Sequence, residues 1–187
     1  ENFVGTGIKG HSGDGGAALE ADIEEIYAIQ VDTNGDVYIC QRFNPAIRKI
    51  DANTRTITTV AGTGQTGSGK DDIPGTESSM IEPNDCILDG KGGLLIADVQ
   101  DQKIRRLDLA TDLIHAFAGT GEMEHSGDGE MAITASIFGA RAVCVDKRGN
   151  TYLCERGGNT IRQIDTSGII TTIAGTGCKG YTGDGKP

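Results

Sequence analysis

The sequence predicts an all-β fold made of three copies of one four-stranded antiparallel sheet. The first observation is a long repeat, because a Gly-Thr-Gly motif recurs at Gly5, Gly62, Gly119 and Gly175, at spacings of 57, 57 and 56 residues. The second is that each copy contains four short runs of β-branched and apolar residues, separated by Gly, Asn and Asp turns. The third is that the first run of each copy is apolar on both faces, so both faces should be covered.

The four runs are clearest in the third copy. They are Arg141–Asp146, Thr151–Cys154, Thr160–Asp165 and Ile169–Ala174, joined by turns such as Lys147–Asn150. Runs of 4–6 residues joined by turns of this kind predict an antiparallel meander. The three meanders are expected at about residues 26–61, 83–118 and 140–174.

Each sheet needs neighbours, and stacking the sheets radially supplies them, which predicts a β-propeller. Ile29, Cys86 and Val143 are equivalent and should point one way, whereas Gln30, Ile87 and Cys144 should point the other. The Gly-rich segments are predicted to cross from the outer strand of one sheet to the inner strand of the next. Ala17–Glu25 could hold a helical turn within one such segment.

Composition limits the classes of function. The formal net charge is −10 and the pI about 4.7, which argues against a broad nucleic-acid-binding face. No apolar run reaches 18 residues, so no membrane span is predicted.

The five cysteines form no CxxC pair and their number is odd, so we expect free thiols and an intracellular, reducing compartment. Cys40 and Cys154 share a repeat position with Ala97, which predicts a small buried apolar site.

Three motifs suggest chemistry but favour structural interpretations. Gly5–Gly10 fits GxGxxG, yet an acidic Ser-Gly-Asp-Gly follows where a nucleotide phosphate would need a helix N-terminus. Asp14, Asp128 and Asp184 could each contribute one ligand to calcium, but one acid per loop is too few, so a turn-capping role is expected. His11 and Ser12, repeated as His125 and Ser126, are adjacent in a tight loop and do not suit a catalytic triad.

Charged residues that are identical in all three copies are expected to hold the sheets together, as ion pairs and turn caps. Three arginines recur with an aspartate three residues on, in the pairs Arg48 and Asp51, Arg105 and Asp108, and Arg162 and Asp165. A further aspartate recurs at the end of each first run, at Asp32, Asp89 and Asp146.

Positions that differ between copies are the better candidates for binding. Tyr27, Asn84 and Arg141 are equivalent and open the first strand of each sheet. Arg42, Val99 and Arg156 are equivalent and lie just past the second strand. Strand ends of a propeller converge on one face, so we expect Tyr27, Asn84, Arg141, Arg42 and Arg156 to form a polar recognition surface there.

The pattern AGTG, SGDG, VD, GNxY, IRxID and IxTxAG, in that order, resembles NHL repeats over essentially the whole chain. The resemblance implies a ring of about six blades, of which three are present. The chain would then be either part of a longer propeller or a half-ring completed by a second copy.

We expect a non-catalytic scaffold that binds a protein or small ligand on one face, with no cofactor or metal, because no His occurs in any inner strand. One alternative is half of a metal-dependent propeller enzyme of the hydrolase or lyase type, with its ligands elsewhere. The other is a structural subunit of a larger assembly.

Overall fold

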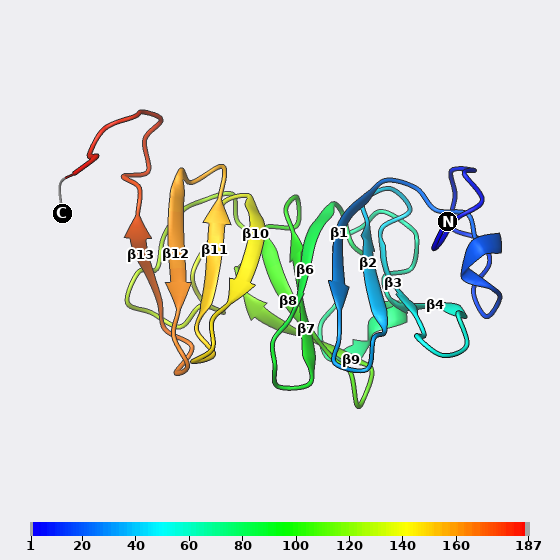
Figure 1. The fold of residues 1–187 in the computed structure, drawn as a ribbon. Helices are drawn as coiled ribbons and strands as arrows, with labels where there is room; N and C mark the ends of the chain where they lie inside the picture. The colour runs from blue at the N-terminus through cyan, green and yellow to red at the C-terminus, as the bar shows by residue number, and fades with distance from the viewer. Residues whose placement is uncertain (1, 186–187) are drawn as a thin grey trace.

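Three antiparallel sheets stand side by side in the computed structural model, which describes residues 2–185 (Figure 1). Within each sheet the strands follow chain order. Sheet 1 contains β1 (Ile26–Val31), β2 (Val37–Gln41), β3 (Ala46–Ile50) and β4 (Ile57–Ala61). Sheet 2 contains β5 (Ile73–Pro74), β6 (Pro83–Leu88), β7 (Gly93–Asp98), β8 (Lys103–Asp108) and β9 (Leu113–Ala118). Sheet 3 contains β10 (Ala140–Val145), β11 (Thr151–Glu155), β12 (Thr160–Ile164) and β13 (Ile170–Ala174). The predicted all-β fold of repeated meanders is therefore confirmed.

Aspartates close the turns at one end of the sheets, which we call the hairpin end. Asp32, Asp89 and Asp146 each accept backbone N–H bonds two and four residues on, as in Asp89 with the N–H groups of Lys91 and Gly93 at 2.6 and 2.8 Å. Asp51 and Asp108 cap the turn before the outer strand by accepting N–H groups two and three residues on, and Asp165 does so with N–H groups two and four residues on. These contacts explain why an aspartate recurs after each inner strand and each third strand.

The Gly-rich crossovers run along the outer edge of the next sheet. β5 pairs with β9, and single bridges join Ala17 to Thr56 and Met131 to Ile169 at the equivalent places in sheets 1 and 3. Sheet 2 therefore has a fifth, two-residue strand that the sequence pattern did not predict. Each short helix follows such a contact, at η1 (Ala18–Glu20) and η2 (Gly75–Glu77). The helical turn expected in Ala17–Glu25 is this single 3₁₀ turn.

The core lies between the sheets. One cluster, between sheets 1 and 2, includes Tyr38, Cys40, Cys86 and Leu94. A second, between sheets 2 and 3, includes Leu95, Ile104, Val143 and Leu153. A third packs the N-terminal segment onto sheet 1. Each sheet is thus stabilised by burying its apolar face against another part of the chain.

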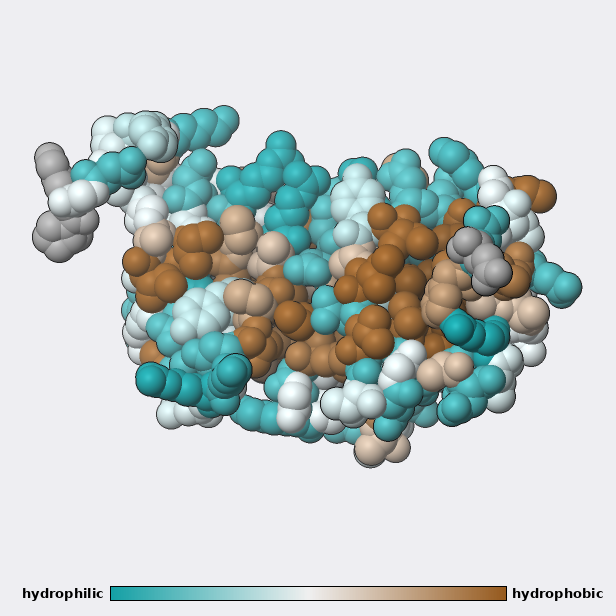
Figure 2. Space-filling view, in the orientation of Figure 1, coloured by the Kyte–Doolittle hydropathy of each residue, from teal (hydrophilic) through white to brown (hydrophobic). Residues whose placement is uncertain are grey.

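The outer face of sheet 1 is covered by the N-terminal segment at Ile39, Ile50 and Ile57 but not along β1, and sheet 3 also has an uncovered apolar face. This corrects the expectation that every inner strand is covered on both faces. Ile29 and Val31 of β1 are 56% and 58% exposed, and Cys144 and Cys154 of sheet 3 are exposed. Cys154 is therefore not the buried residue that its equivalence to Cys40 predicted, because sheet 3 has no neighbour on that side. Figure 2 shows apolar residues gathered over both end sheets on the side that faces the viewer.

No helix within residues 2–185 is long and apolar enough to cross a membrane.

Candidate functional site

The first residues of the inner strands form a β-bulge in every sheet. The register of each inner strand with its partner skips one residue, between Ile26 and Ala28 in sheet 1 and at the equivalent steps in sheets 2 and 3. The skipped residues are Tyr27, Asn84 and Arg141, which are three of the predicted binding residues. A bulge residue is released from strand pairing and its side chain is re-aimed, so these three positions are free to differ between copies.

These three side chains belong to one hydrogen-bonded chain that crosses all three sheets. Arg141 Nε donates to Asn84 Oδ1 at 3.1 Å, and Asn84 Nδ2 donates to the carbonyl oxygen of Glu82 at 3.1 Å. Arg42 Nη2 pairs with Glu82 Oε1 at 2.8 Å, and Arg42 Nη1 donates to the Tyr27 hydroxyl at 2.9 Å. We call Tyr27, Arg42, Glu82, Asn84 and Arg141 the strand-end network.

The network leaves one guanidinium group, that of Arg141, available to a ligand. Arg42 lies over the rings of Tyr27 and Phe43, at 5.2 Å from each centroid, and is held by Glu82. Arg141 uses only Nε in the hydrogen bonds of residues 2–185, so its two terminal nitrogens can still donate. A planar guanidinium with free N–H groups suits a carboxylate.

Arg156, the fifth predicted residue, does not join the network. It is exposed and lines an open cleft of about 400 Å³ with Val99, Phe138 and Lys179. Val99 occupies the position of Arg42 in sheet 2, so the network has no arginine from that sheet. The strand-end face therefore carries two separate basic positions, one at Arg141 and one at Arg156 with Lys179.

Three acids of this face were missed by the sequence interpretation. Glu82 joins Arg42 to Asn84, and its equivalent Glu25 lies 3.9 Å from Arg42 Nη1. Their recurrence in two copies, just before the inner strand, was the available signal. Asp85 bridges two inner strands, because its carboxylate accepts the N–H groups of Cys86 and Val143, both at 2.9 Å. Burial raises the pKa of Asp85.

The recurring arginines are buried inside the sheets, but their ion-pair partners are not the aspartates three residues on. Arg48 and Arg162 are 0% exposed, and each pairs with a Gly-loop aspartate at 2.7 Å, Asp14 and Asp128 respectively. Arg105 pairs with Asp71 at 2.8 Å, so Asp71 takes this place in the loop that lacks the Ser-Gly-Asp-Gly motif.

The loop aspartates also bind the outer strand, through the N–H groups of Thr59 and Thr172 at 2.9 Å. Asp14 and Asp128 thus tie the crossover to its sheet rather than capping their own loop. Asp184 instead accepts a hydrogen bond from the Tyr181 hydroxyl at 2.9 Å.

The His-Ser-Gly-Asp motifs do not assemble a triad. The Ser12 hydroxyl donates to Asp22 at 2.8 Å, while His11 Nε2 lies 3.3 Å from the Thr59 hydroxyl. His125 Nδ1 lies 2.8 Å from Glu155 Oε2. Burial, and then the nearby Arg48 charge, lower the pKa of His11. Within residues 2–185, no three His, Cys, Asp or Glu side chains are grouped so as to hold a metal ion.

Known proteins resemble this chain in sequence and in fold. Teneurin-1 of Gallus gallus is 27% identical over 201 residues, which cover 95% of this chain and 7% of teneurin-1. Human NHL repeat-containing protein 2 is 29% identical over 101 residues, covering 53% of this chain and 14% of that protein. This chain therefore spans only a small part of the relatives it matches.

A solved protein of Bacteroides thetaiotaomicron, described as of unknown function, superposes with a TM-score of 0.63 at 18% identity. The superposition covers 82% of this chain and 36% of that one, and at this identity it supports the fold alone. The family model for the teneurin NHL domain matches residues 88–182, about half of the chain. With the repeated four-stranded sheets already described, this match shows that the chain belongs to the NHL-repeat family of β-propellers.

Proposed function

We propose that this chain is a non-catalytic binding scaffold, and that it binds a protein segment at the strand-end network. The observation that carries the proposal is that the bulge residue of each inner strand differs between copies, yet all three join one polar network. If these positions only stabilised the sheets, we would expect the same residue in all three copies, as is found for the buried arginines. A polar surface with a few directed groups on a rigid frame is the usual form of a recognition site.

The chemistry of the network favours a ligand that carries carboxylates. Arg141 offers free N–H donors, and Arg156 with Lys179 adds a second basic position on the same face. Tyr27 and Phe43 flank Arg42 and add exposed aromatic surface. Because the protein as a whole carries a formal net charge of −10, an acidic ligand would be attracted to this face only locally.

The test is binding to an array of peptides with matched acidic, neutral and basic compositions, measured at two salt concentrations. We expect selective retention of acidic peptides, weakened about 5- to 30-fold by Arg141→Ala because truncating an interface arginine commonly costs about 1–2 kcal/mol. Arg148→Ala is the matched control, because Arg148 is an exposed arginine in the β10–β11 turn at the hairpin end. Binding that is indifferent to peptide charge, or equally sensitive to both substitutions, would refute the proposed site.

We also propose that the uncovered faces of sheets 1 and 3 are completed by a second copy of the chain, related by a two-fold axis. The support is that each end sheet presents apolar side chains where the central sheet has a neighbour: Ile29 and Val31 at one end, Cys154 and Ile173 at the other. A two-fold axis can bring sheet 1 of each copy against sheet 3 of the other, which closes a six-bladed ring.

A further inference from the structure

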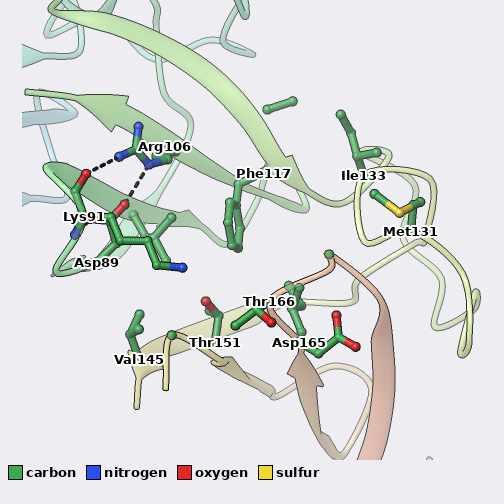
Figure 3. Close-up of a pocket in the computed structure, with 15 residues that line it drawn as sticks. Asp89, Lys91, Arg106, Phe117, Met131, Ile133, Val145, Thr151, Asp165 and Thr166 are labelled. Atoms are coloured by element: carbon green, nitrogen blue, oxygen red, sulfur yellow. Dashed lines mark hydrogen bonds and ion pairs between the residues drawn. The ribbon is translucent and has the colours of Figure 1, made fainter. Parts of the chain in front are cut away.

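A cleft of about 330 Å³ lies between sheets 2 and 3 at the hairpin end, away from the strand-end network (Figure 3). Its apolar lining comes from Leu95, Phe117, Ile133 and Ile164, and its polar lining includes Lys91 and Thr151. In Figure 3 Phe117 projects between the two sheets, with Lys91 on the side of sheet 2 and Thr151 on the side of sheet 3. This volume is within the range of pockets that hold small molecules.

Three residues of the cleft are smaller than their equivalents at the junction of sheets 1 and 2. Strand pairing makes Tyr38, Leu95 and Tyr152 equivalent, since each pairs with the same position of its inner strand. Tyr38 is 3% exposed and belongs to the core between sheets 1 and 2, so its ring fills the space that Leu95 leaves open.

The other two differences are on the facing sheet. Leu94 and Leu109 belong to the core between sheets 1 and 2, and their equivalents in sheet 3 are Thr151 and Thr166. Both threonines line the cleft. One tyrosine and two leucines are thus replaced by smaller side chains at a single junction. Phe117 is larger than its equivalent Val60 and offsets part of this loss of volume.

The mouth of the cleft carries one cation with no carboxylate partner. Arg106 pairs with Asp89 at 2.7 Å and with Asp108 at 3.1 Å, so one guanidinium is shared by two carboxylates. Asp165, which also lines the cleft, accepts the backbone N–H groups of Ser167 and Ile169. Lys91 makes no ion pair among residues 2–185, although it lines the same cleft. A Cβ added at Gly149 would lie 2.8 Å from Lys91 Nζ and 3.6 Å from Thr166 Cγ2. The Lys91 side chain therefore reaches across the mouth of the cleft from sheet 2. Its ammonium group lies at the β10–β11 turn, beside Thr166.

Thr151 adds a second polar group to the cleft. The residue is 3% exposed and lines the cleft. Its hydroxyl can donate or accept a hydrogen bond, so a ligand's polar group can be satisfied there. An apolar floor, a cation at the mouth and a hydroxyl together describe a site for an amphipathic molecule.

We propose that this inter-sheet cleft binds a small carboxylic acid with an apolar, ring-containing or branched body. The body packs on Leu95, Phe117 and Ile133, and the carboxylate faces Lys91. Most of the affinity comes from the buried body, because an ion pair with an exposed lysine contributes little. This site is separate from the protein-binding face, and either proposal can fail without the other.

The probe is 3-phenylpropionate, titrated into the whole chain by calorimetry, with 3-phenylpropionamide as its neutral isostere. A probe of this size should bind with a Kd on the order of 1 mM. The decisive variant is Leu95→Tyr, which restores the residue found in sheets 1 and 3 and should weaken both probes at least about tenfold by filling the cleft. Thr151→Leu, which copies Leu94, should act in the same direction.

Lys91→Gln removes the positive charge at the mouth and keeps the apolar lining of the cleft, so it tests the contribution of the charge alone. It should weaken 3-phenylpropionate by about three- to fivefold and leave the amide within about twofold, because only the acid uses the ammonium. The urea midpoints of the variants show whether each remains folded. Failure of 3-phenylpropionate to bind at 10-fold above the expected Kd, or equal binding to wild-type and both cavity-filling variants with unchanged urea midpoints, would overturn the proposal.

Discussion

At the scale of single residues, the buried arginines occupy the same position in each sheet but have different charged neighbours. Arg162 is surrounded by Asp128, by the carbonyl oxygens of Ser126 and Ser136, and by Glu155, whose side chain is also 0% exposed. In sheet 1 the position equivalent to Glu155 is Gln41, which is neutral, and Arg48 bonds to Asp14 and to the carbonyl oxygens of Ser12 and Asp22. The two arginines thus make nearly the same contacts but differ by one buried negative charge.

Replacing these arginines by methionine should therefore have unequal effects. We expect Arg162→Met to lower the free energy of unfolding by about 3–5 kcal/mol, because it removes the arginine partner of the buried Glu155 carboxylate and leaves only the contacts with His125 and the Phe138 N–H. Arg48→Met should cost clearly less, since its carboxylate partner Asp14 is 43% exposed and can be solvated. Urea unfolding followed by circular dichroism measures both. Equal losses for the two variants would show that Glu155 is not held by Arg162.

Two turn-capping aspartates should make stability depend on acid pH. Hydrogen bonds from the Thr111 N–H and from Arg106 lower the pKa of Asp108 from 3.8 to about 2. The Asn150 side chain and nearby backbone N–H groups lower the pKa of Asp146 from 3.8 to about 2. Because both folded-state values lie below the ordinary value, the stability they contribute is present above about pH 4 and is lost as the pH falls towards 2.

The measurement is the urea midpoint at pH 5, 4 and 3. We expect it to fall from pH 4 to pH 3 in the wild-type protein, and to fall less in the Asp108→Asn, Asp146→Asn double variant. Asp184→Asn is the control, since Asp184 lies outside the sheets and caps no hairpin turn. An identical pH dependence in the double variant would mean that other carboxyl groups dominate this window.

At the scale of elements, the crossover loops depend on their first glycine. Gly119 has a φ of 93°, and a Cβ there would collide with the carbonyl oxygen of Gln102 in the loop between β7 and β8. Gly129 has a similar φ of 87° but nothing lies within 4 Å of an added Cβ. The backbone of each crossover thus passes very close to the preceding sheet at its first glycine and has space at its last.

Alanine substitutions at Gly129 and Gly119 distinguish the need for a positive φ from the need for close approach to the preceding sheet. Gly129→Ala should cost about 1–2 kcal/mol, which is the strain of a left-handed backbone alone. Gly119→Ala should cost more, because the loop must also move away from Gln102 and from Ile137 in the core between sheets 2 and 3. Thermal unfolding of the two variants decides the question. If Gly129→Ala were the more damaging, close approach would not be the reason for the repeated glycine.

The strand positions could be predicted from the sequence because the alternation of side chains and the turn residues depend only on neighbouring residues. The alternation of side chains in Thr160–Asp165, followed by a Thr-Ser-Gly turn, is enough to place β12 and its hairpin. The ion-pair partners could not be read in this way, because Arg162 and Asp128 are 34 residues apart and meet only when the crossover folds back. The position of β5 is hidden for the same reason, since its two residues become a strand only against β9.

In the candidate sites, too, the local features could be predicted from the sequence and the contacts between distant residues could not. The repeat aligned Tyr27, Asn84 and Arg141, but only the register shift explains why these positions face one surface. Glu82 was overlooked because a glutamate before a proline has no meaning until Arg42 of the neighbouring sheet lies beside it. Three residues of the inter-sheet cleft are smaller than their equivalents, and their shared location appears only in the packed structure.

At the scale of the whole molecule, the two end sheets differ from the central sheet in the apolar surface that they expose. The central sheet is covered on both faces, whereas Ile29 and Val31 at one end and Ile173 at the other are each at least 50% exposed. Contiguous apolar surface of this kind marks an interaction site. The proposed ring therefore predicts a concentration-dependent association, with a mass twice the 19.5 kDa of one chain.

The cysteines report this association without any substitution. Cys40 and Cys86 are buried in the core between sheets 1 and 2, and their mutual hydrogen bond, with burial, raises the pKa of the Cys40 thiol. Cys144 and Cys154 lie on the uncovered face of sheet 3, and Cys178 lies in the exposed C-terminal loop. A dilute native monomer should therefore react with a thiol reagent at three cysteines, and all five should react after unfolding.

Concentrating the protein should then protect Cys144 and Cys154 in parallel with the rise in mass, while Cys178 stays reactive. Mass spectrometry of the labelled peptides, with light scattering on the same samples, follows both events. Val31→Lys supplies the matched variant, because it places a charge on the sheet 1 face that should meet sheet 3 of the other copy. It should keep the protein monomeric and keep both thiols reactive at every concentration. Association through another surface would double the mass without protecting these two thiols, and the two-fold ring would then be wrong.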